Sequence, residues 1–368
     1  TDVTITGADL TSANLTGALL ARAHLTGVDL HGVDLRSVDL GGVDAQGVHW
    51  SVDLQGANLS ASNLAGLSLQ YDHLARANFA GATLSSVNLW AASAQGTNFH
   101  GANLTSADLI GCDLLGADLQ YADLTGSTGG KFVNARLAHA NLSNSYSELG
   151  TFAGSDVTGA NFTGAALRWA DFSNVTATGA NFTGARLDIA RLNGADFGGA
   201  NLQGANLYGA DLTGIKLSGA NLTGVRSGAT TGVPASLPLG WQMFNTYLIG
   251  PGAYLDGAGF YHLDLSYANL QGATLRGVEI TYGKLAHANL QNADLSHMNG
   301  DWVSFVGASL QGASLQGGWF ENADFTGANL AGANLTNARL TWAKFSGANL
   351  TNTICPNGIV HGNAYANC

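Results

Sequence analysis

The sequence has few charges, prolines and cysteines, and it contains no long hydrophobic run. Charged residues make up 11% of its 368 residues, and there are only 4 Pro and 3 Cys. A polar residue interrupts the apolar pattern about every five positions, so no run of 18 apolar residues exists. A membrane-spanning helix is therefore excluded.

Catalytic and cofactor motifs are also absent. No HExxH, CxxC or GxSxG occurs, and no glycine-rich loop follows a strand and opens a helix. The 10 His are scattered, and His262, two residues from Asp264, has no evident nucleophile beside it. We therefore expect no catalytic residue, no cofactor and no bound metal, and we expect that the protein is not an enzyme.

A five-residue period runs through almost the whole chain. It is clearest in residues 195–222, which read ADFGGANLQGANLYGADLTGIKLSGANL. Every fifth residue there is Phe or Leu, and Ala or Ile stands two places before it. Helices repeat every 3.6 residues and strands every 2, so a period of five indicates a larger repeating turn.

The pattern also has a physical logic. A five-residue side with two inward positions needs one large and one small side chain, because large residues from all sides meet in a narrow interior. Asp or Asn between them faces water. Gly often follows two places after the central Leu or Phe, as at Gly17, Gly27 and Gly204, which suits a tight corner.

The pattern resembles the pentapeptide-repeat family, whose motif is A(D/N)LXX. Copies occur as Ala8-Asp9-Leu10, Ala102-Asn103-Leu104, Ala210-Asp211-Leu212 and Ala333-Asn334-Leu335. The resemblance implies an all-β fold in which four pentapeptides form one square coil and the coils stack into a right-handed quadrilateral parallel β-helix, a solenoid. About 16 coils would fit the chain.

The five-residue count divides the chain into four parts. Residues 1–225 are expected to form the first part of the solenoid, and residues 253–354 the second. The repeat is lost in residues 226–252, which hold three of the four prolines, so we expect a loop insert whose apolar side chains pack it along a face of the solenoid. A hinge between two rods and an enzyme lid are the alternatives. Residues 355–368 predict a C-terminal cap.

Two irregularities interrupt the count in the first part. One residue is lost at Ser51, and the stretch TGSTGGK at residues 125–131 shifts the register again. The glycines of that stretch predict a bulging corner and not a linker.

The interior positions give two further expectations. Residues 20 apart should stack, which predicts internal ladders; the members are Phe132, Phe152 and Phe172, then Phe162 and Phe182, then Phe305, Phe325 and Phe345. Asp72 falls on a small inward position. We expect a local distortion to swing this carboxylate to solvent, because burying it without a partner is costly; a buried functional acid is the alternative.

The tail is bounded by two cysteines. We expect a disulfide between Cys355 and Cys368, which would pin the tail over the exposed edge of the last coil. Zinc binding by the same cysteines with His361 would have too few ligands. Cys112 is expected to be a free thiol that behaves as a small apolar residue. The disulfide in turn implies an oxidising compartment.

Acidic residues concentrate in the N-terminal third. Residues 1–125 hold 12 Asp against 3 Arg. Four successive sides of one coil carry an acid, and the pattern recurs once; the two predicted acidic rings are Asp29, Asp34, Asp39 and Asp44, and Asp108, Asp113, Asp118 and Asp123. Some members of the family imitate DNA in shape and charge and protect topoisomerase, so the rings make a DNA-mimicking, topoisomerase-interacting protein one alternative function.

Large aromatic residues line one outward side of the second part. Tyr282, Trp302 and Trp342 share one repeat position, Trp319 lies nearby, and Asn322 stands between them. Exposed aromatic residues in a line are unusual on a monomer surface and predict a recognition site. The alternative is that the rings cover one another or are covered by the insert.

These features favour a secreted, non-catalytic solenoid that acts as a structural or binding scaffold and presents flat faces to a protein or polysaccharide partner. The chain begins without Met, which favours removal of a secretory signal, although a trimmed chain would look the same. A first coil without a cap favours head-to-tail self-assembly into filaments as a further alternative. We expect no nucleic-acid partner, and a cytoplasmic location is the alternative to secretion.

Overall fold

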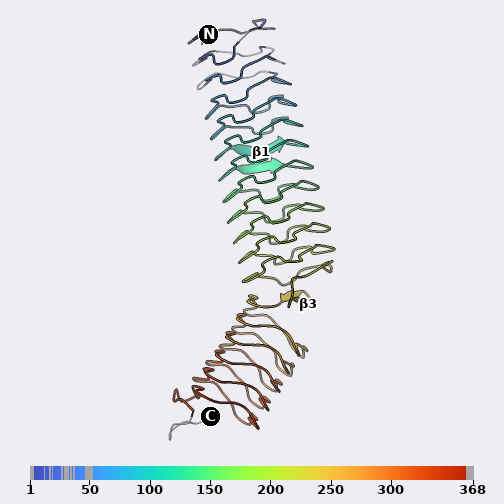
Figure 1. Cartoon of the computed structure of the whole chain (residues 1–368), viewed down its shortest axis with the longest axis vertical. Helices are drawn as coiled ribbons and strands as arrows, with labels where there is room; N and C mark the ends of the chain where they lie inside the picture. The colour runs from blue at the N-terminus through green and yellow to red at the C-terminus, as the bar shows by residue number, and fades with distance from the viewer. Residues whose placement is uncertain are drawn as a thin grey trace. The chain divides into compact units, whose positions relative to one another are not determined.

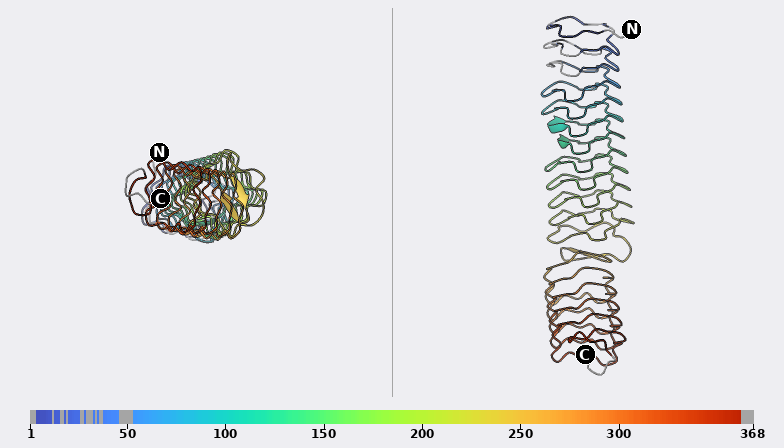
Figure 2. Two further views of the ribbon diagram at one scale, coloured as in Figure 1. Left: turned by 90° about the horizontal axis from the view of Figure 1, so that it is seen from below. Right: turned by 90° about the vertical axis from the view of Figure 1, so that its left-hand side faces the viewer.

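The computed structural model describes residues 4–11, 13–15, 18, 20–25, 28, 33, 35, 38–45 and 53–361. It divides the chain into two compact units. Unit 1 comprises Thr1–Asn221 and Thr231–Ser236, and unit 2 comprises Leu222–Thr230 and Leu237–Cys368. Figure 1 and the right-hand view of Figure 2 show that each unit is a stack of thin coils.

Twenty residues complete one coil. Parallel bridges join residues 20 apart in both units, as Asn161 joins Asn181 in unit 1 and Asn269 joins Asn289 in unit 2. Each five-residue side thus contributes only about one bridge, and few stretches are long enough to count as strands. Unit 1 contains the parallel pair β1 (Asp108–Asp113) and β2 (Thr128–Lys131), and unit 2 contains the antiparallel pair β3 (Gln242–Phe244) and β4 (Tyr247–Ile249).

The interior has the predicted alternation of small and large side chains. In one side of unit 1, Ala160 and Phe162 are buried and the Asn161 between them is partly exposed. The phenylalanine ladders are confirmed, since ring centroids one coil apart lie 4.8 Å (Phe132–Phe152), 4.7 Å (Phe162–Phe182) and 4.8 Å (Phe305–Phe325) from each other. Aromatic stacking at this spacing adds to the burial of apolar area.

The corners explain two preferences of the repeat. The residue two places after each centre adopts a positive φ, for example Gly164 at 67° and Gly204 at 66°, a conformation in which glycine avoids a steric cost. The Asp or Asn just before the centre does more than face water, because its side chain accepts the backbone N–H of the residue that begins the corner. Asn161 Oδ1, for example, accepts the N–H of Thr163 at 3.1 Å.

Both irregularities of register appear in unit 1. Asp39 pairs with Asn58 and Asp44 with Asn63, 19 residues apart, so one residue is missing from this coil, as predicted; Ser51 itself lies outside the described residues. The β1–β2 pairing shifts register between Leu109 and Asp113, and Gly129 and Gly130 have φ of 75° and 103°. The predicted bulging corner is confirmed.

The expectation for Asp72 was wrong. Its side chain is 7% exposed, so it stays inside the coil. No local distortion releases it, because the backbone hydrogen bonds on both sides are intact: the Asp72 N–H donates to Leu69 O at 3.3 Å, and the Ser93 N–H donates to Asp72 O at 3.0 Å. Swinging the carboxylate outward would break this ladder.

The insert continues the stack of coils in each unit and does not lie along one of its faces. In unit 1, Thr231 and Ser236 form parallel bridges with Asp211 and Lys216. In unit 2, Trp241, Phe244 and Tyr247 pack against the hydrophobic core, and the centroids of the Tyr247 and Phe260 rings lie 5.0 Å apart. Leu248 and Ile249 of β4 are fully buried. The apolar residues of the insert are thus used within the coil stack.

After Pro356 the chain turns back on the last coil. Ile354 and Val360 form an antiparallel bridge, and the His361 N–H donates to Thr353 O at 2.7 Å. Cys355 is buried, whereas Cys368 lies outside the described residues. The disulfide and the lid that it would hold therefore stay predictions.

Cys112 is a free, fully buried thiol in β1, as predicted. Burial, with a smaller contribution from the charge of Asp113, raises the pKa of its thiol from 9.0 to about 12. The unfolded chain therefore loses this proton before the native state does. The stability contributed by the neutral thiol is complete below pH 9.0 and is lost progressively as the pH rises from 9.0 towards about 12.

Thiol labelling tests both the burial of Cys112 and the predicted disulfide. At pH 8 and without reductant, we expect no label on the folded protein and one label after denaturation, because the thiolate is the reactive form and Cys112 cannot form it while buried. Denaturation with reductant should give all three labels. Intact mass spectrometry measures these numbers, and three labels before reduction would exclude a disulfide in the preparation.

Candidate functional site

Three of the four predicted aromatic residues stand on one corner of unit 2. Tyr282, Trp302 and Trp342 occupy the left-handed corner position of their coils, with φ of 59°, 60° and 59°, and Asn322 holds the same position between the last two, with φ of 58°. Trp319 lies on the adjoining side, three residues before Asn322. We call Tyr282, Trp302, Trp319 and Trp342 the aromatic stripe.

This corner differs from the other three corners of unit 2 because it contains no glycine. Its five left-handed residues are His262, Tyr282, Trp302, Asn322 and Trp342. Glycine recurs with a positive φ at the other corners, at residues 252, 257, 272, 277, 307, 312, 317, 327, 332 and 347. A large side chain in this conformation costs about 1 kcal/mol relative to glycine. The corner therefore keeps its large side chains at the expense of stability.

The rings partly cover one another but remain accessible. His262 stacks on Tyr282 with ring centroids 5.3 Å apart, and Tyr282 stacks on Trp302 at 6.0 Å. The exposed fractions are 53% for Tyr282, 54% for Trp302, 48% for Trp319 and 74% for Trp342. Since the insert packs against the core, it does not provide the cover that was the alternative explanation.

Charged and polar groups border the stripe. The Arg339 guanidinium lies 4.8 Å from the centre of the Trp319 ring, a cation–π contact. Asp301 and Glu321 lie directly before Trp302 and Asn322 in the chain, and Asp301 Oδ1 accepts the backbone N–H of Glu321 at 2.9 Å. Neither carboxylate forms an ion pair with any residue in the described part of unit 2.

The second acidic ring serves the fold. The Oδ1 atoms of its four members, Asp108, Asp113, Asp118 and Asp123, accept the backbone N–H two residues on at 3.0–3.1 Å. The register shift also places Arg136 against Asp118, with 3.1 Å between Nη1 and Oδ2. In the first ring, Asp39 and Asp44 are described, whereas Asp29 and Asp34 lie outside the described residues. The four carboxylates of the second ring therefore have a structural role at the corner turns.

Sequence inspection missed an apolar corner in unit 1. Leu149, Trp169 and Ile189 occupy the left-handed position in three successive coils, with φ near 60°, and all three are exposed. Next to Leu149, at the register shift, a cleft of about 370 Å³ is lined by Ile110, Gly129 and Tyr146, among others. Sorting the corner residues into columns 20 apart would have revealed this corner, because its three members all follow the register shift and share one five-residue count.

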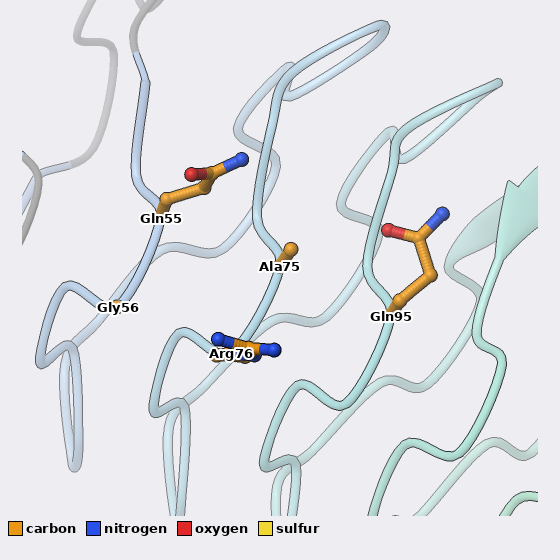
Figure 3. Close-up of a pocket in the computed structure, with 5 residues that line it drawn as sticks. All are labelled: Gln55, Gly56, Ala75, Arg76 and Gln95. Carbon is orange, nitrogen blue, oxygen red and sulfur yellow. The ribbon is translucent and has the colours of Figure 1, made fainter.

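A shallow hollow of about 500 Å³ lies on another side of unit 1. Figure 3 shows Gln55 and Gln95 on the coils on either side of the one that carries Ala75 and Arg76. The Gln95 carboxamide already accepts the Ser93 hydroxyl at 2.6 Å and donates to Asp113 Oδ2 at 2.7 Å. The hollow therefore reflects the small side chain of Ala75 in a row of longer polar residues.

The described residues lack two further features that would indicate a function. No helix there is long and apolar enough to cross a membrane. The same part of the chain contains no group of three or more His, Cys, Asp or Glu side chains that could hold a metal ion.

A family model described as "Pentapeptide repeats" matches the chain in eight copies. The matched residues are 5–42, 73–109, 97–128, 151–188, 190–225, 251–281, 284–318 and 320–353. These copies cover well over half of the chain, in both units. No curated protein matches the chain significantly.

Solved structures of pentapeptide repeat proteins are also similar to the chain. HetL, involved in heterocyst differentiation regulation in the cyanobacterium Nostoc sp. strain PCC 7120, is 28% identical over 73% of this chain and 92% of its own, with a TM-score of 0.18. A protein of the Arabidopsis thaliana thylakoid lumen is 31% identical over 33% of this chain and 66% of its own, with a TM-score of 0.12. QnrB1, a plasmid-mediated fluoroquinolone resistance protein, is 18% identical over 60% of this chain and 89% of its own, with a TM-score of 0.20.

Proposed function

Because the chain belongs to the pentapeptide-repeat family, we propose that it is a non-catalytic binding scaffold whose recognition surface is the aromatic stripe of unit 2. Proteins of this family fold as right-handed quadrilateral β-helices, and the bridges between residues 20 apart agree with that fold. Such a fold holds each corner rigidly, so aromatic side chains there lose little conformational entropy on binding.

The glycine-free corner is the observation that supports this proposal. Five successive coils place a side chain where glycine would be more stable, and three of the five are Tyr or Trp. Backbone strain that the fold does not require is typical of functional sites. Exposed Trp and Tyr in a line are also the residues that most often dominate binding energy at interfaces.

The proposed setting is extracellular, with a cell-surface protein or a polysaccharide as the partner. A disulfide between Cys355 and Cys368 would persist only in an oxidising compartment. The second acidic ring does not by itself indicate DNA mimicry, because each of its four carboxylates also has a structural role at a corner turn.

Replacing both Trp302 and Trp342 with glycine tests the proposal. We expect the double variant to be as stable as the parent or slightly more stable, because glycine relieves about 1 kcal/mol of strain at each corner while Trp302 loses its contact with Tyr282. Binding should nevertheless be lost on a glycan array and in pull-downs from extracellular extracts. Thermal melts measure the stability.

Trp169→Gly is the matched control, because it removes an exposed tryptophan from a left-handed corner of unit 1. It should leave partner binding intact. Partner binding that survives the double substitution, or that is lost equally in the control, would exclude the aromatic stripe as the recognition surface.

A further inference from the structure

The aromatic stripe is interrupted at one coil. Trp302, Asn322 and Trp342 hold the same corner position in three successive coils. Coils spaced like neighbouring strands rise about 4.8 Å each, so the two tryptophan positions are about 10 Å apart. An asparagine side chain is much shorter than an indole, and Asn322 is only partly exposed, whereas Trp302 and Trp342 are exposed. We call the space above Asn322, between Trp302 and Trp342, the aromatic gap.

The ring of Trp302 is oriented by its neighbour. Tyr282 stacks on it with an angle of 19° between the planes. One face of the Trp302 indole is thus directed towards Tyr282, and the opposite face is directed towards the coil of Asn322. A group in the aromatic gap would meet this second face.

Two carboxylates without a cationic partner border the aromatic gap. Asp301 precedes Trp302 and Glu321 precedes Asn322, and within the described part of unit 2 neither forms an ion pair. The nearby cation Arg339 is already placed over Trp319. The surroundings of the gap are therefore negative, and the electron-rich faces of indoles also attract positive charge.

We propose that the aromatic gap accepts one lysine or arginine side chain of a partner protein; this proposal rests on the proposed function of the aromatic stripe. A cation halfway between the indoles would lie about 5 Å from each, within the roughly 6 Å over which cation–π attraction acts. Glu321 and Asp301 supply the complementary charge. An uncharged partner such as a neutral glycan would leave both carboxylates without a counter-charge in the interface.

Peptides that differ in one side chain test the charge requirement. The probes are acetylated, amidated Gly-Ser peptides with lysine, arginine or norleucine at the central position, where norleucine keeps the aliphatic stem but lacks the charge. Indole N–H signals of the ¹⁵N-labelled full chain, assigned with Trp302→Phe and Trp342→Phe, report binding. We expect the lysine and arginine peptides to shift both signals and to bind at least about fivefold more tightly than the norleucine peptide.

Glu321→Gln separates charge from shape. It should weaken binding of the lysine peptide without changing binding of the norleucine peptide, whereas the control Glu148→Gln in unit 1 should change neither. Raising the salt concentration should also weaken only the binding of the charged peptides.

Two results would overturn the proposal: equal binding of the lysine and norleucine peptides, and shifts that are absent from both indole signals with every peptide. The proposed function would survive either result if the Trp302→Gly and Trp342→Gly double variant still lost its partner. The partner would then recognise the aromatic stripe without a cation.

Discussion

Leu212→Asp is expected to unfold the coils of unit 1 around it. Leu212 is fully buried, and its N–H donates to Thr231 O at 2.8 Å, so its side chain cannot turn outward without breaking the ladder. Asp at this position would place a carboxylate among stacked leucines, where it finds no partner. We expect the free energy of unfolding to fall by more than about 4 kcal/mol, a loss that is exceptional for a single substitution.

The neighbouring change Asp211→Ala is the control. Asp211 points outward, and its Oδ1 accepts the Thr213 N–H at 3.0 Å and the Thr213 hydroxyl at 2.6 Å. Losing these bonds should cost about 1 kcal/mol, because they are partly exposed to water. Urea denaturation followed by circular dichroism compares the two variants. Equal losses would contradict the assignment of inward and outward positions.

Gly129→Ala is expected to have the second largest effect. Gly129 adopts a φ of 75°, and an added Cβ would lie 2.6 Å from the Ile110 Cα and 2.8 Å from the Ile110 N. These are backbone atoms of β1, so the clash is relieved only by separating β1 from β2. The conformational cost and the overpacking together should destabilise the protein by about 3 kcal/mol.

Gly116→Ala isolates the conformational part of this cost. Gly116 has a φ of 64°, but an added Cβ would meet no atom within 4 Å. The control should therefore lose only about 1 kcal/mol. Because a solenoid can open locally, hydrogen exchange of the amides in β1 and β2 is the best measurement. Faster exchange in both variants to the same extent would show that the contact with Ile110 is unimportant.

The repeat determined most of the fold because its information is local. The pattern within each pentapeptide determines which residues point inward and where the chain turns, and it recurs in some sixty copies. The internal position of Phe152, the free buried thiol of Cys112 and the bulge at Gly129 all followed from counting in fives. The aromatic stripe could be found in the same way, since no register break separates Tyr282 from Trp342.

Other features depended on which coils become neighbours, and only the tertiary structure decided them. The register shift pairs Arg136 with Asp118, 18 residues away. Asp72 stays inside because the hydrogen bonds to the coil that follows hold its backbone. In the insert, Thr231 and Ser236 pair with Asp211 and Lys216 of the preceding coil. These bridges use backbone hydrogen-bonding groups that would otherwise lack a partner where the repeat stops. A local pattern specifies whether a side chain points inward or outward. Contacts between neighbouring coils depend instead on the number of residues in each coil.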